Sequence, residues 1–82
     1  MKTYLMFESR FTYGPNTTRD QQNLLTPIRA NLLASGQTIF KQLTESVERE
    51  QCLTGLIDVW HIGVECARTT PATAGAGGGA AA

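Results

Sequence analysis

The first thirteen residues alternate between two sets of side chains with a period of two. One set is Thr3, Leu5, Phe7, Ser9, Phe11 and Tyr13, and the other is Lys2, Tyr4, Met6, Glu8, Arg10 and Thr12. A period of two, rich in aromatic residues, is typical of a half-buried β-strand. We therefore expect an N-terminal strand. Because one strand cannot satisfy its own backbone, it needs a partner, either from a second copy of the chain or from residues 57–66.

A turn and an amphipathic helix are expected after this strand. The Gly-Pro-Asn run at residues 14–16 is typical of a turn, and Thr17 or Thr18 is suited to cap the helix that follows. Its apolar stripe is formed by Leu24, Leu25, Ile28, Leu32 and Leu33. Pro27 either kinks this helix or begins a new one, and Gly36 is expected to end it.

A second helical pattern begins near Thr38 and continues as far as Ala67, but its apolar stripe changes phase. The first half has Ile39, Phe40, Leu43 and Val47 on one face, and the second half has Leu53, Leu56, Ile57, Trp60 and Val64. At about 100° per residue, the second face is rotated by roughly a quarter turn from the first. The simplest explanation is a break between Glu50 and Gly55, since glycine is a poor residue inside a helix.

The segment at residues 57–66 fits either of two structures. In a helix, it has a second apolar side formed by Cys52, Val59, Ile62 and Cys66, with Gly55 and Gly63 among them. One short preceding helix cannot cover two apolar sides, so the second side would be covered by another subunit. In a strand, alternating residues from Trp60 to Cys66 would be buried, and this strand would pair with the first. The helical pattern covers more residues.

These patterns predict a mostly α fold: an N-terminal strand, then two or three helices, in a homodimer. The alternative is an α+β fold in which residues 57–66 are a second strand paired with the first. From Pro71 the sequence is PATAGAGGGAAA, which has too few apolar side chains to offset the entropy of ordering. The sequence therefore predicts a domain at residues 1–70 and a disordered tail at residues 71–82.

A domain of about 70 residues buries only about 60% of the surface that its unfolded chain exposes. Such small domains often need a disulfide, a metal ion or a second subunit for stability. In one helix Cys52 and Cys66 would lie roughly 21 Å apart, whereas the Cα atoms of a disulfide lie within about 7 Å. We therefore expect buried thiols in a reducing compartment. Oligomerisation is then the remaining way to stabilise the domain.

The 82-residue chain has no net charge, but the charges are unevenly distributed. Residues 1–41 have five basic and two acidic side chains, a net +3, and residues 42–82 have two basic and five acidic side chains, a net −3. The asymmetry fits either packing between complementary segments or an anionic partner for the N-terminal half. No secretory signal or long apolar stretch is present, so we expect a soluble, cytoplasmic protein without membrane contact.

The only histidine, His61, would share a helix face with Asp58 and Glu65. Such a group could hold a metal or transfer protons, but the simpler interpretation is a solvated polar stripe. The sequence has no hydrolase elbow, phosphate-binding loop or metal-ligand motif. We therefore expect no enzymatic activity, no metal and no cofactor. Trp60 is expected in the core, or as an interface anchor if its face is open.

The expected function is therefore that of a small adaptor, inhibitor or regulatory protein that acts by protein–protein contact. The expected partners are a second copy and an unidentified protein. The candidate binding residues are Val59, Ile62, Cys66, Trp60, Asp58, His61 and Glu65. Compact chains without motifs resemble, in general character only, the accessory proteins of phages and other mobile elements.

An alternative comes from the element order, in which a strand and a helix precede Gly36 and a second helix. This order is similar to that of the ribbon-helix-helix repressors over roughly residues 2–50. The resemblance implies a dimer whose paired strands enter the major groove of DNA, with Lys2, Tyr4 and Arg10 facing outward. Glu8 and the low basic content do not favour this alternative.

Overall fold

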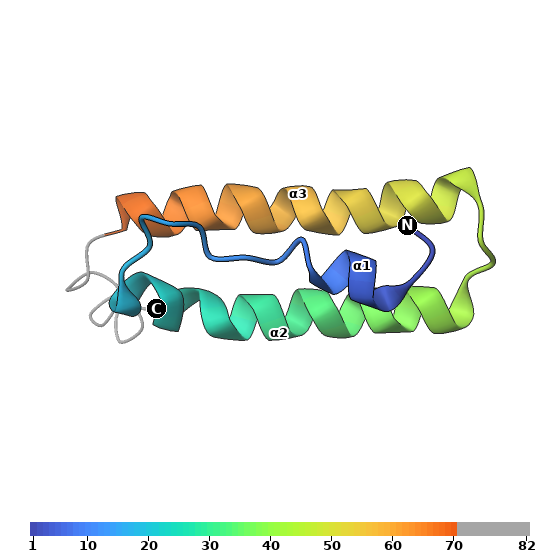
Figure 1. The fold of residues 1–82 in the computed structure, drawn as a ribbon, viewed down its shortest axis with the longest axis horizontal. Helices are drawn as coiled ribbons and strands as arrows, with labels where there is room; N and C mark the ends of the chain where they lie inside the picture. The colour runs from blue at the N-terminus through green and yellow to red at the C-terminus, as the bar shows by residue number, and fades with distance from the viewer. Residues whose placement is uncertain (71–82) are drawn as a thin grey trace.

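The computed structural model describes residues 1–70, which form three helices, α1 (Tyr4–Glu8), α2 (Arg19–Gln42) and α3 (Val47–Thr69). The two long helices form an antiparallel hairpin (Figure 1). The N-terminal segment, residues 1–18, runs between them in the same view and contacts both. The predicted tail at residues 71–82 lies outside the described residues.

The expected N-terminal strand is not formed, because residues 4–8 are the helix α1. Thr3 caps this helix by accepting a hydrogen bond from the backbone N–H of Met6 at 3.2 Å. The side chains that enter the core are Phe7 and Phe11, four residues apart, whereas Leu5 is 72% exposed. The buried side chains therefore do not follow the period-two pattern, and no strand occurs among residues 1–70.

Helix α2 begins at a capping box, in which Thr18 and Gln21 hydrogen-bond each other's backbone N–H groups. The helix continues through Pro27 and past Gly36, so the predicted end at Gly36 is wrong. Glycine is needed there for another reason. A Cβ atom at Gly36 would lie 2.1 Å from the ring of Phe7, so the missing side chain makes room for this ring.

Helix α3 is continuous from Val47 to Thr69, so the predicted break between Glu50 and Gly55 is wrong. The strand alternative for residues 57–66 is wrong for the same reason. The chain turns earlier, at residues 43–46, where Ser46 accepts a hydrogen bond from the Arg49 N–H at 3.1 Å and caps α3. The change of phase in the apolar stripe therefore marks the change from one helix to the next.

The core lies where the N-terminal segment meets the hairpin. Its buried members are Phe7, Phe11, Leu25, Leu33, Leu53, Ile57, Trp60, Val64 and Ala67. Of the five core residues predicted from the second half of the helical pattern, four are confirmed as buried, and Leu56 is half-buried. The N-terminal segment thus takes the place that a third long helix would have in a bundle.

Among the hydrogen bonds that join this segment to the hairpin, two reach its backbone at Phe11 and Thr12. Trp60 of α3 donates from Nε1 to the carbonyl oxygen of Thr12 at 2.8 Å. Arg29 of α2 donates from Nε to the carbonyl oxygen of Phe11 at 2.9 Å. The ring of Phe11 packs against two other rings, with its centroid 4.8 Å from that of Phe7 and 5.8 Å from that of Trp60. The segment therefore covers one side of the hairpin.

Candidate functional site

Helix α3 has two apolar sides, and only one of them is buried. The core face of α3 consists of Leu53, Ile57, Trp60, Val64 and Ala67. The second side, called here the outer row, consists of Cys52, Gly55, Leu56, Val59, Ile62, Gly63 and Cys66. At about 100° per residue, Val59, Ile62 and Cys66 lie roughly 100–160° around the helix from Trp60. The outer row is therefore turned away from the N-terminal segment.

The outer row is open to solvent over most of its length. Val59 is 51% exposed and Ile62 is 64% exposed. Both cysteines are exposed free thiols, so the expectation of buried thiols is wrong. A Cβ atom built at Gly55 would meet nothing within 4 Å. Only Leu56 and Gly63, on the edge next to α2, are half-buried, and Gly63 lies near Leu25 of that helix.

The spacing of the chain explains why both stripes occur on one helix. Steps of three and four residues connect the members of the core face, and the same steps connect Cys52 to Cys66 along the outer row. Either series alone would produce an amphipathic helix. Helix α2 and the N-terminal segment cover the core face, and no other described part of the chain reaches the outer row.

A polar row borders the outer row on α3. Asp58, His61 and Glu65 are all exposed, as the helical spacing predicts. Glu65 accepts a hydrogen bond from Nη1 of Arg68 at 2.7 Å, in an exposed ion pair of small energetic value. Residues 1–70 contain no group of three side chains that could hold a metal ion. The three residues therefore form a polar margin beside an apolar surface.

Trp60 does not belong to this surface. Its side chain is fully buried in the core and packs against Phe11 and Tyr13, with ring centroids 5.8 Å and 5.6 Å away. Its indole N–H is occupied by the carbonyl oxygen of Thr12. The structure thus brings Val59, Ile62 and Cys66 together on the surface and separates Trp60 from them.

The three N-terminal candidates do not form one surface on a strand. Lys2 and Arg10 are exposed on either side of α1 in the sequence, and Tyr4 is half-buried. The ring of Tyr4 lies 6.0 Å from that of Phe7 and 6.3 Å from that of Phe40. Tyr4 therefore packs against the hairpin.

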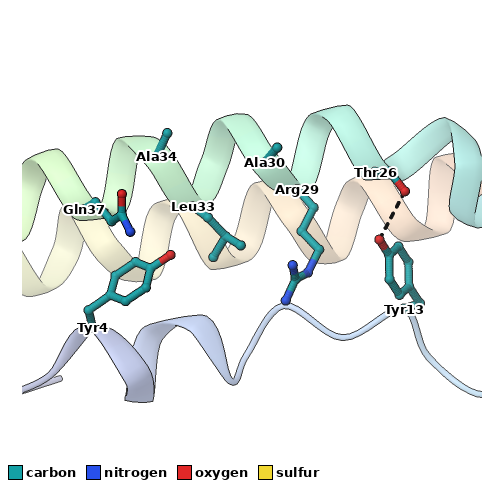
Figure 2. Close-up of a pocket in the computed structure, with 8 residues that line it drawn as sticks. All are labelled: Tyr4, Tyr13, Thr26, Arg29, Ala30, Leu33, Ala34 and Gln37. Carbon is teal, nitrogen blue, oxygen red and sulfur yellow. Dashed lines mark hydrogen bonds between the residues drawn. The ribbon is translucent and has the colours of Figure 1, made fainter.

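A shallow pocket of about 340 Å³ lies between the N-terminal segment and α2, and Figure 2 shows the residues that line it. Tyr4 and Tyr13 point toward α2, where Arg29 reaches back to the segment and Thr26 lies 3.3 Å from the Tyr13 hydroxyl. Burial, and next the nearby Glu8 carboxylate, raise the pKa of Tyr4. Sequence reasoning missed this pocket, because no local pattern connects residues of the segment with Arg29.

The described residues therefore define a helical hairpin with a packed N-terminal segment and one uncovered apolar helix side. The chain matches no family model, no curated protein and no solved structure. Within residues 1–70, no helix has the length and apolar character needed to cross a membrane.

Proposed function

We propose that this protein is a small, non-enzymatic adaptor, inhibitor or regulatory protein that acts by protein–protein contact through the outer row of α3. The observation that supports the proposal is the exposure of Val59 and Ile62 at the centre of a row without charged residues. Interface centres are depleted of charge, whereas their rims are polar. Asp58, His61 and Glu65 supply such a rim.

Covering the outer row would be favourable by an amount that matters for binding. Full burial of a valine or isoleucine side chain contributes about 1.5–3 kcal/mol, and Val59 and Ile62 each keep half or more of their surface in solvent. Placing these two residues under a partner would therefore contribute about 2 kcal/mol or more before the costs of association.

The test compares the wild-type protein with Ile62→Lys and with a matched control, Leu5→Lys. Leu5 is 72% exposed on α1, so the control introduces the same charge at an equally open apolar position. A protein captured from the native host is purified, and its binding to the three chains is measured by calorimetry. We expect Ile62→Lys to weaken binding at least tenfold and Leu5→Lys to bind as the wild type does. Equal binding by all three chains would contradict the proposal.

The DNA-binding alternative depends on an N-terminal ribbon, and residues 4–8 form α1 in its place. We therefore propose no second function. A cytoplasmic location and a role as an accessory protein of a phage or mobile element stay predictions.

A further inference from the structure

The outer row is symmetric about Val59. Cys52 and Cys66 each lie seven residues from Val59, Gly55 and Gly63 each lie four residues away, and Leu56 and Ile62 each lie three residues away. The order of side-chain types along α3 is therefore the same in both directions: cysteine, glycine, large aliphatic, valine, large aliphatic, glycine, cysteine. A surface with this property presents the same kinds of side chain, in the same order, to a second copy that runs in the opposite direction.

A twofold axis between two helices, perpendicular to both, makes them antiparallel and brings each residue opposite its symmetric counterpart. If the axis passes at Val59, this residue meets its own copy. Cys52 then lies opposite Cys66 of the second copy, and the same pair recurs at the other end. Residues seven apart drift by only about 20° around a helix, so all three positions stay on the contact.

The two flanks of the outer row then fit large side chains against glycines. Leu56 and Gly63 lie on the flank beside α2, and Gly55 and Ile62 lie on the other flank. The twofold axis keeps each flank on the same side of the pair, so Leu56 of one copy lies at the same height as Gly63 of the second copy. Ile62 likewise reaches the level of Gly55 of the second copy, where a Cβ would meet nothing within 4 Å in the single chain. Ile62 therefore has open space to enter beside Gly55 of the second copy, whereas Leu56 and Gly63 are already half-buried beside α2.

We infer that α3 packs antiparallel against α3 of a second copy across a twofold axis at Val59, with Cys52 of each chain opposite Cys66 of the other. The inference rests on the proposed function, because it names the occupant of the same face. The chain is neutral overall, and the outer row itself has no charged residue, so no charge is buried at the centre of the contact. The row is only about 21 Å long, so the contact is smaller than a standard interface and the dimer is reversible.

Disulfide formation between the cysteines tests the proposed alignment of the two α3 helices directly. Within one continuous α3 they are roughly 21 Å apart and cannot join, since the Cα atoms of a disulfide lie within about 7 Å. Any disulfide in the folded protein therefore links two chains. The exposed thiols lie at the ends of the proposed contact and not at its centre, so replacing one with serine leaves Val59 and Ile62 in place.

The experiment treats the folded chain with diamide and separates the products on a non-reducing gel. Diamide takes up two electrons and two protons as two thiols lose their S–H hydrogens and form one S–S bond. We expect the wild type to give a covalent dimer, and Cys52→Ser and Cys66→Ser each to lose it. An equal mixture of the two variants regains the band, because a pair of unlike chains places Cys66 of one opposite Cys52 of the other and the reversible dimers exchange until such pairs are linked.

Two results would overturn the inference. A dimer band that persists in either single variant would mean that like cysteines meet, which requires another register. Absence of the band in the wild type at high concentration would mean that the two sites do not meet at all. As a second measurement, light scattering should show a concentration-dependent mass for the wild type and Leu5→Lys, and a monomer for Val59→Lys.

The two proposals can fail separately. If the wild type is cross-linked as expected but Ile62→Lys still binds the captured protein normally, the dimer stands and the proposed function fails. If the chain stays monomeric and Ile62→Lys loses the captured protein, the proposed function stands and the second copy is not the occupant.

Discussion

The two apolar sides of α3 have similar spacing, but they differ in what covers them. The core face is closed by α2 and by the aromatic side chains of the N-terminal segment, and its five members are at most 6% exposed. In the outer row, Val59 and Ile62 are more than half exposed. Apolar periodicity alone therefore identifies sides that can be buried, and the number of neighbouring segments decides which side the chain buries by itself.

The largest expected difference between the two sides concerns their bulkiest members. Trp60→Ala should lower the free energy of unfolding by about 3–5 kcal/mol, because it leaves a cavity beside Phe11 and removes the donor to the Thr12 carbonyl. Ile62→Ala, on the outer row, should change it by no more than about 0.5 kcal/mol in the monomer. Urea unfolding at low protein concentration measures both. Similar losses in the two variants would show that the outer row also contributes to the core.

A smaller effect is expected at the glycine of α2. Gly36→Ala would bring a methyl group to 2.1 Å from the ring of Phe7 and force the ring out of its position. We expect a loss of about 1–3 kcal/mol, although alanine is the better helix former. Thermal unfolding should show a lower midpoint. An unchanged or higher midpoint would mean that Phe7 can move aside without cost.

The smallest effect is expected, with the opposite sign, at the glycine of the outer row. Gly55→Ala meets nothing within 4 Å in the single chain, so it should stabilise the monomer by about 1 kcal/mol through helix propensity alone. In the inferred dimer the same methyl group would occupy the hollow for Ile62 of the second copy. The variant should therefore melt at a higher temperature when dilute and give less diamide-linked dimer than the wild type. A higher melting temperature together with more diamide-linked dimer would contradict the packing proposed for this glycine.

The sequence predicts the core face of α3 well, but it predicts the beginning of this helix and the N-terminal segment poorly. Leu53, Ile57, Trp60 and Val64 are identifiable because their helical spacing repeats over about three turns. The strand expected at the N-terminus arose from a short alternating pattern, whereas Phe7 and Phe11 are buried through contacts with Gly36 and Trp60, far away in the chain. Short patterns carry too little information to outweigh such tertiary contacts.

The predicted helix end at Gly36 and the predicted break near Gly55 are wrong because both rest on glycine alone. The capping residue Ser46 is the better signal for the turn. Gly36 and Gly55 were interpreted as breaks, but one accommodates an aromatic ring and the other lies on an open surface. The signal for the actual turn was Ser46, followed by Glu48 and Glu50 in the first turn of α3. The outer row as a surface was predictable from spacing, whereas its exposure depended on the path of residues 1–18.

The path of residues 1–18 also determines when their aromatic side chains can be buried during synthesis. Phe7 and Phe11 are synthesised about fifty residues before Trp60 and Val64, which belong to the same core, and the ring of Trp60 packs against Phe11. At a translation rate of roughly 5–20 residues per second, the two rings stay without their α3 contacts for on the order of several seconds. A nascent chain that stalls before α3 would therefore display an aromatic cluster of the kind that chaperones and proteases detect.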